Sequence, residues 1–378
     1  NPKSRLILAG SYVDVGKYHE KLELFARKLG LADVIFTGQI RFDEILAYYR
    51  LADVFLCMSE HEGFCVPLVE AMYFDVREKK VLKLAKEAAK AGIELFVLDD
   101  GWFGKRDDDF SGLGDWFVNE KKLCGTLSEL VKEVHDMGLS FGLWFEPEMI
   151  SEDSDLYRAH PDWALVISGR QPIRSRSQLV LDMSREDVTD YLTERICDIV
   201  EKADIQYIKW DMNRSLMAAY SAKLPRDRQG ELRHRYVLGL YKVLEAVTQR
   251  FPELLLEGCS GGGAGMLYYC PQIWCSDNTD AIERLRIQYG TSFGYPMSSV
   301  SAHVSVCPNH QNHRVTPFKT RGICAMQGTF GYELNLGKLS EEEKEDLLKE
   351  IQDKNKHMDM IREKVEKLIV YDKVSLQE

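Results

Sequence analysis

The stretch QYIKWDMN (residues 206–213) is an apolar run that ends in charge. Tyr207 and Ile208 are typical of a buried strand, whereas the charges of Lys209 and Asp211 are costly to desolvate when they are isolated. Two interpretations are open. Either both charges simply reach water where the strand ends, or they belong to an active site at the carboxyl end of a barrel strand, where catalytic residues collect.

The same design recurs along the chain. Apolar runs that end in polar or charged residues also occupy residues 93–102, 139–149, 253–263, 272–280 and 298–309. Helical patterns lie between several of them, as in EKKVLKLAKEAAKAG (78–92) and TLSELVKEVHDMG (126–138). Strand, polar end and helix, repeated in this way, predict an α/β fold of the (β/α)8 TIM-barrel type with one functional rim. This repetition favours the active-site interpretation of Asp211.

The beginning of the chain alternates strand and helix in a shorter rhythm. RLILAG (5–10), VIFTG (34–38) and VFLCMS (54–59) are typical of buried parallel strands, and the segments between them carry apolar residues at helical spacing. We expect a piece of an α/β sheet in front of the barrel. At the other end, the charge-rich stretch from residue 338 onward predicts one or two solvated helices.

Composition bounds the class of protein. The 378 residues are 45% hydrophobic and 29% charged, as in a soluble globular protein. The net charge of −11 argues against a nucleic-acid or anionic-membrane partner. We find no transmembrane run and no secretory signal pattern. The nine cysteines include no C-x-x-C pair and indicate reduced thiols, which predicts a cytoplasmic protein.

One short motif invites a metal assignment. CPNHQNHR (307–314) brings Cys307, His310 and His313 close together in the sequence. No second cluster supplies further ligands at a recognisable zinc spacing. We therefore predict no metal site.

Two carboxylates at separate strand ends are what glycoside hydrolysis needs, because one attacks the anomeric carbon and the other protonates the leaving oxygen. Asp211 suits the nucleophile, since Lys209 on the same strand face is expected to hold it ionised. Asp277 suits the acid/base, and Asp280 is its rival. A retaining pair is expected to hold its carboxyl groups about 5 to 5.5 Å apart.

Other side chains at the same rim suit a sugar. Asp99 and Asp100 can accept hydrogen bonds from sugar hydroxyls. Trp102 and Trp144 offer flat apolar faces to the C–H side of a sugar ring.

Six ordered blocks carry a family resemblance: FVLDDGWFGKRDDD, GLWFEPEMIS, SQLVLDMS, YIKWDMNR, IWCSDNTDAIERLRIQYGTS and VCPNHQ. Over about residues 70–350 the chain closely resembles bacterial α-galactosidases of glycoside hydrolase family 36. The resemblance implies that Asp211 is the nucleophile and Asp277 the acid/base. It implies sugar contacts at Asp99, Asp100, Trp144, Arg176, Lys209, Asn213, Cys259 and Gly262.

The reaction implied by the resemblance is retaining, exo-acting cleavage of terminal α-galactose, from oligosaccharides such as melibiose or raffinose. No metal or organic cofactor is implied, and an oligomer is possible. Two departures leave an alternative open. The stretch CSGGGAGMLYY is four residues shorter than the family pattern beside Cys259, and the β-domains that flank the barrel in the family are missing. The alternative is a catalytically impaired sugar-binding fragment.

About residues 3–72 resemble part of the nucleotide-sugar domain of glycosyltransferase family 4, which implies a partial Rossmann-like segment. Glu62 and Glu70 match the two glutamates that contact the donor sugar and the ribose in that family. Half a domain does not close a donor site, so a nucleotide-sugar transferase is the least supported function.

The two resemblances meet at residues 68–76. The transferase pattern begins a helix at Glu70, whereas the hydrolase pattern makes residues 70–76 the first barrel strand. We expect a strand, since the barrel does not close without it. The expected division is a transferase-like segment (1–69), the barrel (70–350) and a helical tail (351–378).

Overall fold

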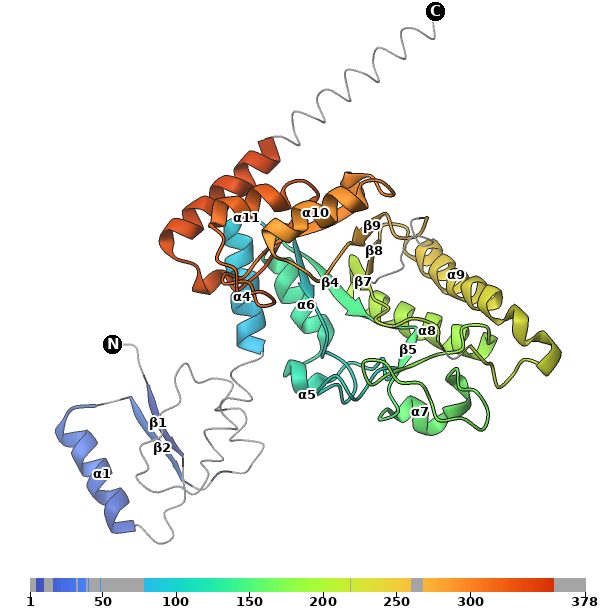
Figure 1. Ribbon diagram of the computed structural model, residues 1–378. Helices are drawn as coiled ribbons and strands as arrows, with labels where there is room; N and C mark the ends of the chain where they lie inside the picture. The colour runs from blue at the N-terminus through green and yellow to red at the C-terminus, as the bar shows by residue number, and fades with distance from the viewer. Residues whose placement is uncertain are drawn as a thin grey trace, which may run out of the picture. The chain divides into compact units, whose positions relative to one another are not determined.

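The computed structural model describes residues 5–9, 16–31, 33–38, 40, 48, 78–217, 219–259 and 268–356. The chain divides into two compact units, Asn1–Val81 and Leu82–Glu378. Figure 1 traces the elements of each unit.

The first unit contains two paired strands and a helix. Strand β1 (Leu6–Ala9) pairs in parallel with β2 (Val34–Gly38), and α1 (Gly16–Lys28) connects them. These elements confirm the predicted parallel strands in RLILAG and VIFTG, but the predicted burial is wrong, because Leu6, Ile7 and Ile35 are exposed. The predicted strand VFLCMS lies outside the described residues, as do the junction at 68–76, Glu62 and Glu70.

Seven strands form one sheet in the second unit. In chain order they are β3 (Leu95–Leu98), β4 (Ser140–Phe145), β7 (Tyr207–Trp210), β8 (Leu255–Cys259), β9 (Gln272–Trp274), β10 (Val300–Ser305) and β11 (Thr329–Glu333). Every neighbouring pair is parallel, and the spatial order of the strands is the same as their order in the chain. A sequential parallel sheet is the arrangement of a TIM barrel. All six apolar runs predicted in this part of the chain contain one of these strands, whereas β11 was not predicted.

Helices follow most of the strands. They are α4 (Glu78–Ala91), α5 (Glu120–Leu123), α6 (Leu127–Asp136), α7 (Asp155–Ala159), α8 (Glu186–Ala203), α9 (Leu232–Arg250), α10 (Ala281–Thr291) and α11 (Phe318–Ala325). Helix α6 packs on β4, and α8 packs against both α6 and α9 (Figure 1). Helix α11 packs on β10. Residues 341–356 are also helical.

Short elements complete this unit. Strands β5 (Met149–Ile150) and β6 (Leu179–Val180) form an antiparallel pair outside the main sheet. The 3-10 helices are η1 (Pro161–Trp163), η2 (Arg226–Glu231), η4 (Met297–Ser299) and η5 (Leu336–Lys338). Across the described part of the chain, no helix is both long enough and apolar enough to cross a membrane.

Helix α6 shows how local sequence sets these elements. Thr126 and Glu129 form a capping box, in which each side chain accepts the other residue's backbone N–H. The face with Leu127, Leu130 and Val134 is buried. The helix therefore begins at the signal that its sequence carries and packs along its apolar face, as predicted.

Candidate functional site

Strand register aligns the residues at the carboxyl ends of β7, β8 and β9. Lys209 pairs with Glu257, so Asp211 and Cys259, each two residues further along, lie at the same level. Cys259 pairs in turn with Trp274. Since side chains two residues apart share a face of a sheet, Lys209 and Asp211 project to one side.

Asp211 is a buried carboxylate held by N–H donors. Its Oδ2 accepts hydrogen bonds from Trp144 Nε1 at 3.0 Å and from Asn213 Nδ2 at 2.8 Å. Its Oδ1 accepts the backbone N–H of Met212 at 2.8 Å. Only 6% of the residue is exposed. Three N–H donors on a buried carboxylate fix its orientation.

Lys209 forms its ion pair with a different carboxylate. Its ammonium lies 2.9 Å from Asp99 Oδ2 and 5.7 Å from the centre of the Trp274 ring. Burial is the largest single influence and acts to lower the pKa of Lys209, but the charge of Asp99 and the hydrogen bond to it, together with Cys259 and Glu257, outweigh burial, and the net shift is upward. The ion pair that the structure records for Lys209 is thus with Asp99, whereas the carboxylate of Asp211 accepts hydrogen bonds from neutral N–H donors.

Cys259 lies beside both proposed catalytic carboxylates. Burial, then the charge of Asp211 and a hydrogen bond to it, and more weakly the charge of Asp277, raise the pKa of the Cys259 thiol. A thiol with a raised pKa stays protonated at neutral pH. Cys259 is thus a neutral group at the base of the site, within electrostatic range of Asp211 and Asp277.

Asp277 lies at the exposed side of the site. Its Oδ1 accepts a hydrogen bond from Trp274 Nε1 at 2.8 Å, and its backbone carbonyl accepts one from Gln311 Nε2 at 2.9 Å. The residue itself is exposed. An acid/base must exchange protons with a leaving group and with water, which suits an exposed carboxyl group.

The rival residue, Asp280, has another task. It is the N-cap of α10, where its carboxylate accepts the backbone N–H of Glu283 at 3.0 Å. Arg314 Nη1 donates to its Oδ2 at 2.7 Å, and only 1% of Asp280 is exposed. A carboxylate that caps a helix and pairs with an arginine is poorly placed to exchange protons, which favours Asp277.

Asp100 and Trp102 are both held by the protein itself. The guanidinium of Arg106 binds Asp100 through two nitrogens, with a shortest contact of 2.8 Å. Trp102 is 1% exposed and donates its indole N–H to the Trp144 carbonyl at 2.9 Å. The prediction that Trp102 offers a face to a sugar is therefore wrong, since the ring lies in the core. Trp144 is also buried, with the Phe103 ring stacked 6.3 Å away.

Arg176 lies on a turn next to the end of β7. It is exposed and adopts a left-handed backbone conformation with φ of 52°. Arg214 ties this turn to the strand end, because its Nη1 donates to the carbonyls of Ile173, at 3.0 Å, and Gln178. Gly262 and the shortened glycine stretch lie outside the described residues.

The sequence analysis missed Glu146 as a member of this site. Its Oε1 accepts the backbone N–H of Asn213 at 2.6 Å and Nε2 of Gln178 at 2.7 Å. Burial, and then the charge of Asp211, raise the pKa of Glu146 to about 7. The signal was available, because Glu146 lies two residues after Trp144 in the quoted block GLWFEPEMIS.

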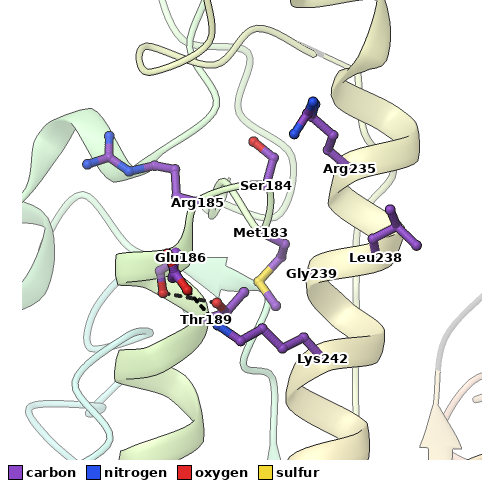
Figure 2. A pocket seen from close by; sticks show the side chains of 9 residues that line it. All are labelled: Met183, Ser184, Arg185, Glu186, Thr189, Arg235, Leu238, Gly239 and Lys242. Atoms are coloured by element: carbon purple, nitrogen blue, oxygen red, sulfur yellow. Dashed lines mark hydrogen bonds and ion pairs between the residues drawn. The ribbon is translucent and has the colours of Figure 1, made fainter.

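A separate pocket of about 240 Å³ lies between the start of α8 and the middle of α9 (Figure 2). Its cations are already paired, Arg185 with Asp187 and Lys242 with Glu186. None of the predicted site residues lines it. Within the described residues, no three His, Cys, Asp or Glu side chains are grouped to hold a metal ion.

Family comparison places the chain among known enzymes. Residues 58–364 match the model of the Melibiase family, and residues 1–76 match that of glycosyl transferases group 1. The bifunctional alpha-galactosidase/sucrose kinase AgaSK of Mediterraneibacter gnavus is 54% identical over 324 residues, which are 84% of this chain and 34% of the relative. Alpha-galactosidase AgaA of Geobacillus stearothermophilus is 57% identical over 280 residues, 73% of this chain and 38% of the relative. The chain spans less than half the length of these relatives.

Solved structures give the same result. The galactosidase domain of AgaSK superposes with a TM-score of 0.72 at 58% identity, covering 77% of this chain and 40% of the other. A variant of AgaA in complex with raffinose superposes with a TM-score of 0.73 at 54% identity, covering 74% of this chain and 40% of the other. These matches confirm both predicted resemblances and the predicted barrel class.

Proposed function

Since this chain belongs to the melibiase family, we propose that it is a retaining, exo-acting α-galactosidase. The observation that carries the proposal is the pair of unlike carboxylates around Cys259. Asp211 is buried and held by three N–H donors, whereas Asp277 is exposed and held through one oxygen. A fixed, ionised carboxylate suits a nucleophile, and an exposed one suits proton exchange.

The proposed reaction has two displacements. In the first, an Asp211 oxygen bonds to the anomeric carbon while the glycosidic C–O bond breaks and Asp277 gives its proton to the leaving oxygen. In the second, Asp277 takes a proton from water, the water oxygen bonds to the anomeric carbon, and the bond to Asp211 breaks. Two inversions give net retention. No metal or organic cofactor takes part in either step.

The remaining predicted residues are proposed to bind the galactose. Lys209 and Asp99 form a charged pair whose donors and acceptors suit sugar hydroxyls, and Asp100 lies beside them. We assign Arg176, Asn213, Trp144, Cys259 and Gly262 to the same role from the family pattern. Solved complexes of AgaA variants contain raffinose and stachyose. We propose terminal α-galactosides of that kind, such as melibiose and raffinose, as substrates.

We also propose a cytoplasmic location. The seven cysteines in the described part of the chain are all free thiols. Free thiols are typical of reducing compartments.

The proposal is tested by hydrolysis of nitrophenyl α-galactoside, with the anomer of the first-formed galactose followed by proton NMR. We expect α-galactose to form first, and Asp211→Asn to be inactive. First formation of β-galactose would contradict retention. Galactose binding without turnover in the unaltered chain would support the alternative, a sugar-binding fragment that the shortened glycine stretch has disabled.

A further inference from the structure

We propose that Trp274 is a positioning residue for the acid/base Asp277, an inference that rests on the function proposed above. The indole Nε1 of Trp274, at the end of β9, donates to Asp277 Oδ1 at 2.8 Å. Asp277 itself is exposed and follows the strand by three residues. An exposed carboxyl group samples several rotamers unless a contact restrains it.

The Trp274 ring is itself fixed. It is 6% exposed, and the Arg284 guanidinium lies 4.4 Å from its centre. Arg284 comes from α10 and is 2% exposed, and its Nη1 contacts Cys275 Sγ. The Lys209 ammonium lies 5.7 Å from the same ring, and the His303 ring lies 4.6 Å away. Contacts with neighbours on several elements leave the ring little freedom, so the direction of its N–H is set by the fold.

This hydrogen bond distinguishes the two carboxyl oxygens of Asp277. Because Oδ1 accepts the indole N–H, Oδ2 is left to carry the proton. In the first displacement the Oδ2–H bond breaks and the proton goes to the leaving oxygen as the glycosidic C–O bond breaks. In the second, Oδ2 takes a proton from the attacking water. The indole N–H also stabilises the carboxylate that exists between these two transfers.

The test is the dependence of rate on the leaving group. Trp274→Phe keeps a ring between its neighbours but removes the N–H donor. We expect kcat/KM for methyl α-galactoside, whose leaving group needs protonation, to fall by about tenfold, the effect of one lost hydrogen bond in the transition state. The value for dinitrophenyl α-galactoside, which needs little protonation, should stay within about twofold. Equal losses on both substrates, or no loss on either, would overturn the proposal.

Three further variants separate a positioning role of Trp274 from a packing role. Trp163→Phe makes the same change at another buried indole, which stacks on His160 at 4.2 Å, and should leave both rates unchanged. Trp274→3-benzothienylalanine keeps the shape of the ring and lacks only the N–H, so it should reproduce the selective loss without a change in folding. In an Asp277→Asn background, Trp274→Phe should cause no further loss, because Trp274 acts through Asp277. An additive loss there would contradict a positioning role.

A spectroscopic measurement tests the hydrogen bond between Trp274 and Asp277 independently of turnover. In proton–nitrogen NMR, the indole N–H signal of Trp274 is the one that disappears in Trp274→Phe. We expect it to shift in Asp277→Asn, because that substitution changes the acceptor of the indole N–H. A signal unchanged by Asp277→Asn would overturn the inference. Absence of turnover in the unaltered chain would instead count against the proposed function, and this signal would still test the pairing.

Discussion

Asp211 shows that neutral donors, rather than the neighbouring cation, hold the proposed nucleophile. Trp144 and Asn213 both donate to its Oδ2, while Lys209 pairs with Asp99. A carboxylate held by N–H donors is fixed in position for attack on carbon. The sequence placed Lys209 and Asp211 on one strand face but did not show which carboxylate the lysine would reach. The partner of Lys209 is Asp99, which follows β3 and lies more than a hundred residues away in the chain.

The division of roles between the two aspartates predicts different kinetics for two matched variants. Asp211→Asn should abolish turnover of every α-galactoside, however good the leaving group, because no covalent bond forms. Asp277→Asn should spare the first step for activated aryl substrates, since they need little protonation. Steady-state rates on aryl and natural galactosides measure the difference. If both variants lost activity equally on both kinds of substrate, the assigned roles would be wrong.

The residue roles that were hardest to predict depend on burial or on where a helix begins. Asp277 and Asp280 are both aspartates in one short motif, and only the start of α10 shows that Asp280 is a cap. Trp102 follows a strand end as a rim residue would, yet it is in the core. Glu146 was passed over because its role comes from contacts with Asn213 and Gln178, which the sequence separates widely.

At the scale of elements, strand positions were predictable and β11 was not. The predicted runs combine apolar residues with a polar end, which a strand buried inside a barrel produces. Strand β11 (TFGYE) has no such run, and its residues are only partly buried or exposed. Its place as a strand comes from pairing with β10 along five residues, which no local pattern of its own indicates.

Two glycines on helices test how tightly α9 is packed. A Cβ on Gly239 would lie 1.7 Å from the Met183 carbonyl oxygen, whereas a Cβ on Gly290 of α10 would meet nothing within 4 Å. We expect Gly239→Ala to lower the free energy of unfolding by at least about 2 kcal/mol, because the helix must move away. Gly290→Ala should raise it by about 0.5 to 1 kcal/mol, since alanine favours the helix. Urea unfolding measures both, and equal effects would contradict this packing.

The helix at residues 341–356 predicts a pH dependence of stability. Glu350 on this helix is buried beside Tyr332, whose hydroxyl lies 3.3 Å from its carboxylate. Burial raises the pKa of Glu350 from 4.5 to about 7. Between these values the folded state keeps a proton that the unfolded state releases, so stability falls as pH rises from about 4.5 to 7.

Glu350→Gln removes this dependence. Above pH 7 the free energy of unfolding of the variant should exceed that of the unaltered chain by about 1 to 3 kcal/mol. Below about pH 4.5 the two proteins should have similar free energies of unfolding. Glu345→Gln, an exposed position on the same helix, is the control and should change little at any pH. Thermal unfolding across this range is the measurement. A Glu350→Gln variant that was less stable than the unaltered chain at high pH would contradict a buried, charged Glu350.

At the scale of the whole molecule, two family models match one chain. They overlap over residues 58–76, and the predicted junction at residues 68–76 falls within this overlap. The division into segments at 1–69, 70–350 and 351–378 stays a proposal. Composition and motif order were enough to predict the barrel, because the repeated strand ends share one rim. The strand expected at residues 70–76 stays a prediction, because these residues lie outside those that the structure describes.

The central claim is that Asp211 forms a covalent bond to the sugar, and trapping of that intermediate tests it most directly. A fluorinated α-galactosyl fluoride slows the second displacement more than the first, so the glycosyl-enzyme accumulates. Digestion and mass spectrometry should then find one galactosyl adduct, on the peptide that contains YIKWDMNR and at Asp211, with none in Asp211→Asn. An adduct on another residue, or turnover of the reagent without any adduct, would contradict the account.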